Sequence, residues 1–528
     1  MIRLVAQSII ELFLKLFDFL SNKRINKLGE KSVSHALDPT QLADQDTALN
    51  RLTRQHPGKS GFYLLGNNID AFLARCHLIE QAHHTLDLQY YSFHGDTSGQ
   101  LIAQALVKAA DRGVRVRLLL DDIDTLGVDE GISLLNAHPD IEIRIFNPFV
   151  FRGLLRYFEF IVDLARVGRR MHNKAMIADN AQAIVGGRNI SDIYFSADPE
   201  LLFLDVDLLT IGEIVAKVSD SFDEYWNSDW AVPVDELYAR PKRAYALKRI
   251  KLMLQKFEQQ VGQIDYLKTL QLSQFKYDEL QPENLHFVWA DAELVYDLPD
   301  KIVRQQDEQK TTGSAEKYTS LHQLLALAEN HLTIISPYFV PGDEGMRWIK
   351  SLISRGVKIH VYTNSLAATD VVAVHAGYRQ YRMQLLELGV RLYELKPSAY
   401  VRERRHFKIL KPGSRTSLHA KTYVLDHSKV FIGSANLDPR SSELNTEMGL
   451  LIDNEQISDQ FLHMFSGISS GENSYQLLLD DAPAPHTGIV WRCQQDGVAY
   501  HYTEEPEAGL WRRFKAFFYG LLPIESLL

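Results

Sequence analysis

The chain has 528 residues, too many for one ordinary domain, and 45% hydrophobic with 23% charged residues is typical of a globular protein with sizeable cores. Its formal net charge of -10 argues against a global basic field of the kind that attracts nucleic acid, so an anionic ligand must be held by local cations. Its two cysteines, Cys76 and Cys493, are too few for a disulfide framework and lack metal-site spacing.

The first 22 residues predict an amphipathic helix. Polar residues recur at intervals of four from Arg3 to Lys15, on a surface otherwise made of Ile, Leu, Val and Phe. A transmembrane span would place Glu11 and Lys15 near mid-bilayer at about 2.5–3.5 kcal/mol each, and a cleavable signal would need a small-residue cleavage site that is not seen. We therefore expect a helix lying in the plane of a membrane interface, with a helix docked on the protein itself as the alternative. A basic patch suited to anionic headgroups follows it: Lys23, Arg24, Lys27 and Lys31.

Two later stretches predict the same order of elements. Strand 85–93, helix 98–113 and strand 114–122 are matched by strand 332–340, helix 344–356 and strand 357–364. Tyr91 and Tyr338 in the first strands are 247 positions apart, and the helix-ending glycines Gly113 and Gly356 are 243 apart. Alternating strands and helices indicate βαβ units and a mainly parallel (mixed) sheet flanked by helices. The near-constant offset predicts an α/β protein duplicated into two similar lobes.

The remaining segments complete the expected organisation. A charged, helix-like run and the polar stretch PDKIVRQQDEQKTTGSAEK separate the lobes, and the latter predicts a mobile loop. Asp496-Gly497 favours a type I′ hairpin turn. The run GLWRRFKAFFYGLLP mixes aromatic residues with cations, which suits an interface anchor as well as packing onto the core. We expect an N-terminal helix and linker, a first lobe, an inter-lobe segment, a second lobe and a C-terminal hairpin with helix, over residues 1–35, 36–231, 232–318, 319–480 and 481–528.

Each predicted lobe contains one copy of the same motif. The first copy is His172-Asn173-Lys174, Asp179 and Gly186-Gly187-Arg188-Asn189. The second is His419-Ala420-Lys421, Asp426 and Gly433-Ser434-Ala435-Asn436. The two histidines are 247 positions apart, the same offset as the strand tyrosines. One such triplet carries no weight, but two copies in register with a structural repeat indicate a shared function.

The spacing within the motif has physical content. His and Lys at positions i and i+2 of a strand project from one face and reach a single phosphate. Asp179 and Asp426 follow each strand where the chain should turn, so a structural role is favoured over direct chemistry. The small residues, among them Gly187 and Ser434, would let the backbone approach a ligand, and Asn189 and Asn436 would donate to phosphoryl oxygens.

HxKx4D followed by GGxN or GSxN, present twice, resembles the HKD pattern of the phospholipase D superfamily. Longer runs such as VGGRNISDIYF and SLHAKTYVLDHSKVFIGSANLDPRSSELNTEMG resemble bacterial cardiolipin synthases, most closely the cardiolipin synthase C group. The resemblance covers nearly the whole chain. It implies two phospholipase D-like lobes with the active site at their interface, and catalytic roles for His172, Lys174, Asp179, His419, Lys421 and Asp426.

The resemblance also implies a mechanism. One imidazole forms a phosphohistidine and the other acts as acid and base; His172 is expected as the nucleophile and His419 as the acid/base, although near-symmetry leaves the order open. No metal or cofactor is expected, because two lysines supply the positive charge. Asp205 and Glu447, which follow the histidines by 33 and 28 positions, are candidates for orienting an imidazole, with surface or cap roles as the alternative.

The predicted reaction is transfer of a phosphatidyl group to phosphatidylglycerol, from phosphatidylethanolamine or from a second phosphatidylglycerol, at a membrane surface. Hydrolysis of phospholipid is the nearest rival. A nucleic-acid phosphodiesterase is disfavoured by the acidic net charge, and a non-catalytic scaffold by two intact motifs. We expect peripheral attachment to the inner membrane, at its cytoplasmic face.

Overall fold

The computed structural model describes residues 31–38, 47–153, 163–238, 241–261, 284–302, 321–399, 414–480 and 488–522, together with Arg156, Phe158, Glu159 and Gln281. The predicted N-terminal helix and most of the predicted inter-lobe loop, from residue 303, lie outside these residues. No helix in the described ranges is both long and apolar enough to cross a membrane.

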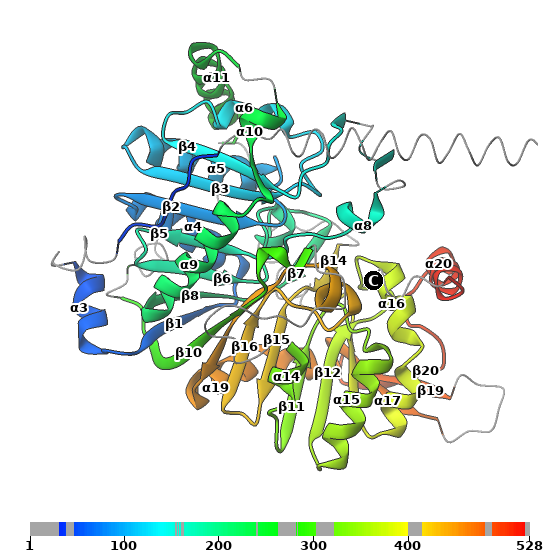
Figure 1. The fold of residues 1–528 in the computed structure, drawn as a ribbon. Coiled ribbons are helices and arrows are strands. Elements are labelled where there is room, and N and C mark those ends of the chain that lie inside the picture. The colour runs from blue at the N-terminus through cyan, green and yellow to red at the C-terminus, as the bar shows by residue number, and fades with distance from the viewer. Residues whose placement is uncertain are drawn as a thin grey trace, which may run out of the picture.

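The first lobe is a mixed sheet flanked by helices (Figure 1), with α4 and α5 packed on one face and α9 on the other. Its strands run side by side in the order β1, β8, β6, β5, β2, β3, β4, β9. Only β2–β3 and β3–β4 are parallel pairs. The elements before and within this lobe are α3 (Ala48–Gln55), β1 (Ser60–Leu65), α4 (Asn68–Gln81), β2 (Thr85–Tyr90), α5 (Thr97–Asp111), β3 (Arg115–Asp121), α6 (Asp129–Leu135), β4 (Ile141–Phe146), α8 (Leu164–Val167), β5 (Ala175–Ala178), β6 (Gln182–Gly186), β7 (Leu201–Leu204), β8 (Asp207–Gly212), α9 (Glu213–Asn227) and β9 (Ala231–Pro233).

The second lobe repeats this plan. β11, β12 and β13 form its parallel part, and β15, β16 and β17 continue the sheet in antiparallel fashion. Its elements are α14 (Leu321–Leu325), β11 (His331–Ile335), α15 (Gly342–Ser354), β12 (Lys358–Asn364), α16 (Val372–Arg379), α17 (Arg382–Glu387), β13 (Arg391–Leu395), β14 (Arg415–Leu418), β15 (Lys421–Leu425), β16 (Lys429–Gly433), β17 (Met448–Asp453), α19 (Glu455–Phe465), β18 (Ser474–Leu479), β19 (Ile489–Gln495), β20 (Val498–Tyr502) and α20 (Leu510–Gly520).

The predicted duplication is therefore confirmed, and local sequence explains the boundaries of its repeated helices. The Asp96 carboxylate caps α5 by accepting from the backbone N–H of Gly99 at 3.1 Å. Gly113 and Gly356 follow α5 and α15 with φ of 92° and 91°, a conformation that glycine adopts without a Cβ penalty. The sheets contain more antiparallel pairing than predicted, because β5–β6 and β15–β16 are hairpins whose tight turns leave no room for a crossover.

The inter-lobe segment contains α10 (Val234–Leu237), the expected charged helix α11 (Arg243–Val261) and a strand that the sequence did not predict, β10 (Val288–Tyr296). The start of β10 pairs with β1 and the rest pairs with β17, both antiparallel. One 18-stranded sheet therefore runs through both lobes in the described residues. A core cluster with buried side chains from both lobes, including Ile177, Val185, Ile432 and Leu450, holds the lobes together.

Two smaller predictions can also be compared with the structure. β19 and β20 form the expected hairpin around Asp496 and Gly497, whose φ angles of 51° and 80° fit a type I′ turn. In the predicted basic patch, Lys31 contacts the protein itself: its ammonium donates to the Ser228 carbonyl, and its side chain is 18% exposed. Lys31 is thus not a free cation for headgroups, and the other three patch residues lie outside the described ranges.

Candidate active site

The two motif histidines sit where the lobes exchange short stretches of backbone. His172 precedes β5, and its N–H donates to the Thr446 carbonyl of the second lobe at 2.8 Å. His419 precedes β15, and its N–H donates to the Leu204 carbonyl of the first lobe at 2.7 Å. The second exchange is extended by β14, which pairs in parallel with β7. Both histidines are buried, at 8% and 5% exposure.

This exchange brings each imidazole to a carboxylate of the opposite lobe. His172 Nδ1 lies 2.8 Å from Glu447 Oε2, and His419 Nδ1 lies 2.6 Å from Asp205 Oδ2. The residue before each carboxylate is the one that pairs with the backbone before the histidine, so one backbone arrangement, used twice, sets both contacts. A hydrogen bond at Nδ1 fixes the ring and directs Nε2 away from the carboxylate.

The motif lysines place positive charge beside the histidines. Each ammonium donates to the backbone carbonyl of its own histidine, Lys174 to His172 and Lys421 to His419. Lys421 Nζ also lies 2.9 Å from Nδ1 and 3.1 Å from Nε2 of His419. Burial lowers the pKa of both histidines, and the charges of Lys174 and Lys421 lower each pKa further, so each lysine also acts on the histidine of the other lobe. Both motifs therefore meet in one site.

Aromatic rings enclose the two imidazoles unequally. Tyr91 meets His172 edge-on, with ring centroids 4.8 Å apart. His419 is stacked on Phe203 at 4.8 Å and meets Tyr194 edge-on at 5.0 Å, with the Tyr194 hydroxyl 3.4 Å from Nε2. His419 Nε2 therefore has polar neighbours, whereas the structure records no hydrogen bond at Nε2 of His172 among the described residues.

Burial governs the protonation of the site. It lowers the pKa of both His172 and His419 to about 4, against the opposing effect of their carboxylate partners, so both imidazoles are neutral near pH 7 in the free protein. Burial also lowers the pKa of Lys174 to about 7 and of Lys421 to about 8. A neutral imidazole is a competent nucleophile, and a lysine close to its pKa binds an anion most firmly at or below neutral pH.

The pKa values of the two carboxylates are also lowered. Burial tends to raise the pKa of Glu447, but its interaction with His172, the charge of Lys174 and the hydrogen bond from Ser434 outweigh burial. Burial likewise tends to raise the pKa of Asp205, but its hydrogen bond with His419 and the positive charges of Lys421 and Arg188 outweigh burial. Both groups remain ionised and hold their histidines electrostatically.

Asp179 and Asp426 do not reach the histidines. Each occupies the turn after its strand with a positive φ, 54° and 52°, and accepts three backbone N–H groups at the start of the neighbouring strand. The donors to Asp426, for example, are the amides of residues 329–331, at 2.7 to 2.9 Å. This geometry matches the structural role that the sequence favoured and argues against their direct participation in catalysis.

Two of the small residues lie against the histidine-orienting carboxylates. A Cβ on Gly187 would lie 2.3 Å from Asp205 Oδ1, and the Ser434 hydroxyl donates to the Glu447 carboxylate. Both residues thus support these carboxylates, and their predicted role in the approach of a ligand stays a prediction. Asn189 Nδ2 donates to the Tyr194 hydroxyl at 2.9 Å, so this amide is engaged within the protein. The Asn436 side chain accepts from Ser336 Oγ at 3.4 Å through Oδ1, while its backbone N–H donates to Ser441 Oγ at 3.2 Å.

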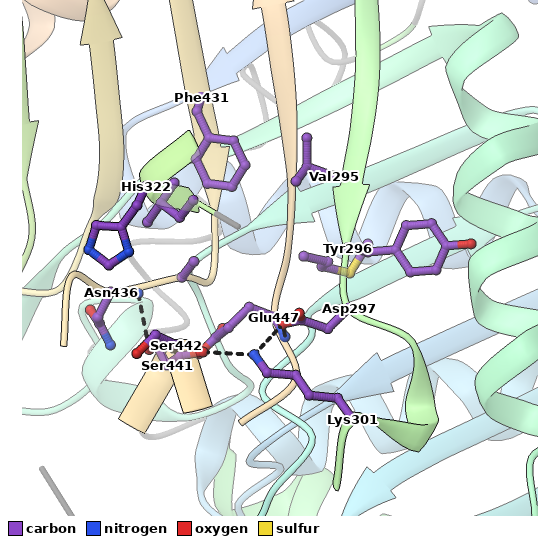
Figure 2. Close-up of a pocket in the computed structure, with 13 residues that line it drawn as sticks. Val295, Tyr296, Asp297, Lys301, His322, Phe431, Asn436, Ser441, Ser442 and Glu447 are labelled. Carbon is purple, nitrogen blue, oxygen red and sulfur yellow. Dashed lines mark hydrogen bonds and ion pairs between the residues drawn. The ribbon is translucent and has the colours of Figure 1, made fainter. Parts of the chain in front are cut away.

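A support for Glu447 that the sequence analysis missed comes from the inter-lobe segment. The Asp297 carboxylate accepts from the Glu447 backbone N–H at 2.9 Å and pairs with Lys301 at 2.8 Å. Lys301 also donates to the Ser441 carbonyl at 3.0 Å, and Ser441 Oγ donates to Glu447 Oε1 at 2.9 Å. Figure 2 shows this arrangement around a small cavity of about 80 Å³ that also reaches Asn436. Residues 299–302, expected to belong to a mobile loop, instead form a 3₁₀ turn that brings Lys301 here.

One cluster in the described part of the chain has the composition of a metal site: His375, Glu394 and Glu505. Arg382 occupies its centre, 2.9 Å from Glu394 and 2.6 Å from Glu505, with its guanidinium 2.7 Å from His375 Nε2. The guanidinium neutralises the two carboxylates, so the cluster is a buried ion network that holds the segment before α20 against α16 and β13.

Comparison with known proteins agrees with this geometry. Residues 76–226 and 321–469 each match the family model described as "Cardiolipin synthase, PLD-like domain". The two matches together span more than half of the 528 residues, and each contains one motif histidine and one of the orienting carboxylates. The chain belongs to this family.

Two cardiolipin synthases are among the proteins that this chain resembles. Cardiolipin synthase C of Escherichia coli (strain K12) is 40% identical over 486 residues, which cover 91% of this chain and 99% of that protein. Cardiolipin synthase A of Pseudomonas putida is 25% identical over 436 residues, covering 82% of this chain and 72% of that protein. The crystal structure of phosphatidylserine synthase from Haemophilus influenzae covers 91% of this chain and 100% of that chain, with a TM-score of 0.52 and 13% identity, a likeness of fold alone.

Proposed function

We propose that the protein makes cardiolipin by transferring a phosphatidyl group from phosphatidylethanolamine to phosphatidylglycerol. The observation that carries this proposal is the crossed pair of contacts, His172 with Glu447 and His419 with Asp205. Each contact holds a buried, neutral imidazole by Nδ1, which leaves two Nε2 atoms for a double displacement at one phosphorus.

In the first step, His172 Nε2 attacks the phosphorus of phosphatidylethanolamine. A P–N bond forms as the P–O bond to ethanolamine breaks, and His419 gives its proton to the departing oxygen. The arriving phosphodiester anion raises the pKa of His419, which lets this imidazole carry that proton. The assignment of the two roles is supported by the surroundings of His419 Nε2, where Tyr194 and Lys421 provide polar contacts.

In the second step, the terminal glycerol hydroxyl of phosphatidylglycerol replaces ethanolamine. His419 accepts the hydroxyl proton, the oxygen attacks phosphorus, and the P–N bond to His172 breaks to release cardiolipin. Lys174 and Lys421 stabilise the negative charge that builds up on the phosphoryl oxygens in both steps. The proposed mechanism needs no metal, because these two ammonium groups supply the positive charge that stabilises the phosphoryl oxygens.

The choice of product is supported by the similarity to the E. coli protein named cardiolipin synthase C, which extends over nearly the full length of both chains. Water competes with the acceptor hydroxyl for the same phosphohistidine, so hydrolysis to phosphatidic acid is the outcome that the test must separate from transfer. A second phosphatidylglycerol as donor satisfies the same chemistry, with glycerol as the leaving group.

The test is a product analysis with purified protein. Labelled phosphatidylglycerol is supplied with and without phosphatidylethanolamine, and the lipids are resolved. We expect cardiolipin only when both lipids are present. Cardiolipin from phosphatidylglycerol alone would show that phosphatidylglycerol is the donor, while the type of reaction would be unchanged. Phosphatidic acid as the sole product, or no lipid product at all, would contradict the proposal. The His172→Ala variant provides the blank, and His77→Ala, which removes a histidine of similar burial (4%) from α4, provides the matched control.

Because both substrates are bilayer lipids, the proposed reaction requires the protein at a membrane surface. We infer peripheral attachment to the inner membrane, at its cytoplasmic face. In fractionated cells the protein should sediment with inner membranes and be released by alkaline carbonate or high salt, as peripheral proteins are. Retention through both washes would contradict peripheral attachment.

A further inference from the structure

α20 packs against the second lobe with its one alanine and exposes its large apolar residues. Ala516 is 2% exposed and lies in a small cluster with Leu366, Ala367 and Ala508. The large apolar side chains of α20 and of the residue after it face outward: Leu510 is 85% exposed, Trp511 67%, Phe514 55%, Phe517 60%, Phe518 50% and Leu521 67%. A helix docked on its own protein buries its large apolar side chains, so this orientation is the reverse of the usual one.

The exposed face is an aromatic surface with a cation beside it. The rings of Trp511 and Phe514 stack with centroids 5.4 Å apart, and Lys515 Nζ lies 5.5 Å from the centre of the Trp511 ring. The segment Leu510–Gly520 has no acidic residue, in a chain whose net charge is -10. Its two arginines bond to the protein itself, Arg512 to backbone carbonyls and Arg513 to Glu504, so Lys515 is the cation that this face presents to headgroups. Aromatic side chains beside cations match the boundary between anionic headgroups and acyl chains. Apolar patches of this kind mark interaction sites.

α20 is also attached to the edge of the active site. Arg512 donates to the carbonyls of Leu366 and Thr369, in the loop that joins β12 to α16. This loop begins after Asn364, whose amide exchanges two hydrogen bonds of 2.8 and 2.9 Å with the backbone of Leu418, the residue before His419.

At its other end the loop reaches the site again. Asp370 accepts a hydrogen bond from the Tyr338 hydroxyl at 2.7 Å. Burial lowers the pKa of Lys421, and the negative charge of Asp370 is one of the influences that oppose this. In Figure 1, α20 lies at the right-hand edge of the molecule beside α16, and α8 of the first lobe is on the same side.

We propose that the aromatic face of α20 docks on the surface of an anionic phospholipid bilayer and thereby holds the rim of the active site, formed by the loop between Asn364 and Val372, at the level of the headgroups. The charge of the helix, its reversed orientation and its attachment beside His419 favour a lipid surface over a protein partner. The proposal deepens the proposed function by identifying where the membrane is contacted. It is tested by binding alone, so it stands or falls separately from the identity of the product.

The experiment measures binding of the full-length protein to vesicles of phosphatidylcholine, with or without phosphatidylglycerol. A variant with Trp511→Ser, Phe514→Ser and Phe517→Ser should bind vesicles with phosphatidylglycerol about a hundredfold less tightly than wild type, because three large apolar side chains no longer enter the interface. Val498→Ser with Tyr500→Ser, which removes two exposed apolar residues (56% and 41%) from β20, is the matched control and should bind like wild type. Equal binding of the α20 variant and the control would overturn the proposal.

Two further measurements test whether the aromatic face of α20 contacts lipid or protein. Trp511 fluorescence, isolated by subtracting the spectrum of a Trp511→Phe variant, should shift to the blue when vesicles are added; an unchanged spectrum counts against docking. Sedimentation without lipid then tests a protein partner. If wild type is a dimer, the triple variant a monomer, and the two bind vesicles equally, the face joins two copies of this chain and the lipid proposal is wrong.

Discussion

The imidazole of His172 and the carboxylate of Glu447, which stand 275 positions apart in the chain, are joined by a hydrogen bond of 2.8 Å across the boundary between the lobes. The same relationship, reversed, joins His419 to Asp205 at 2.6 Å. Neither lobe thus contains a complete catalytic pair by itself. The active site exists only where the two lobes associate, and the backbone pairing of β7 with β14 is part of it.

The Glu447→Gln variant tests the importance of this contact. The amide keeps the shape of the side chain but lacks the charge that fixes the tautomer and orientation of His172. We expect kcat to fall by about 10²–10⁴-fold with the fold retained, as for carboxylates that orient catalytic histidines elsewhere. Asp453→Asn, at the exposed end of the same strand β17, is the control and should remain near wild type. If both variants retain full activity, Glu447 does not position the nucleophile.

The order of the two histidines is tested by trapping the intermediate. In His419→Ala, His172 can still attack a donor with a good leaving group, but the phosphohistidine is not resolved because no base activates the acceptor. The variant is mixed with a p-nitrophenyl phosphodiester that carries a labelled phosphatidyl group, and the reaction is quenched rapidly. We therefore expect labelled protein and a single burst of nitrophenol. His172→Ala should give neither label nor burst. The reverse pattern would exchange the two roles.

The sequence was sufficient to predict most of the fold, because the information is local and repeated. Gly113 and Gly356 end equivalent helices, and the strands that begin at Thr85 and His331 are equivalent as predicted. β10 was missed because its two halves pair with strands of different lobes, an arrangement that no local pattern encodes. Its position depends on tertiary contacts with β1 and β17.

The catalytic residues show the same difference between what local sequence predicts and what only tertiary contacts reveal. The motif marked His172 and His419 because their chemistry requires particular side chains at a fixed spacing. The carboxylates could be proposed from their distance along the chain, but not their pairing across the lobes, since this depends on the pairing of β7 with β14 of the other lobe. Asp297 and Lys301 carry no motif, and only their contacts behind Glu447 reveal them.

Replacing Asp426 with Asn should affect stability far more than chemistry. Burial tends to raise the pKa of Asp426, but three backbone N–H donors outweigh it and lower the pKa, so the ionised carboxylate stabilises the fold at neutral pH. We expect the variant to lose about 0.5–1.5 kcal/mol of unfolding free energy, measured in urea at pH 7, while kcat of the folded protein stays near wild type. The difference should shrink in acid, as pH falls through the lowered pKa and the wild-type carboxyl takes up its proton. A large loss of kcat without loss of stability would restore a catalytic role.

The lysines predict the alkaline side of the pH profile. Burial lowers their pKa values to about 7 for Lys174 and about 8 for Lys421, so positive charge is present below these values and is lost as pH rises through them. The kcat/KM value, which reports the free enzyme, should therefore decline above pH 7–8 and not near pH 10, where an exposed lysine would titrate. Lys174→Arg, whose guanidinium stays charged, should move the decline to higher pH even if the maximum rate is lower. A decline that begins only near pH 10 in wild type would contradict this assignment.

Gly187→Ala separates two explanations for the small residues of the motif. If the glycine is needed for approach of a ligand, alanine should raise KM. The structure instead places the missing Cβ 2.3 Å from Asp205 Oδ1, so alanine should push this carboxylate away from His419 and lower kcat with little change in KM. Gly131→Ala, a helical position with open space around it, controls for the general effect of the substitution and should leave both parameters unchanged. The size of the kcat loss should approach that of Asp205→Asn, and the double variant should be no worse than either single one, because both changes remove the same support from the same imidazole.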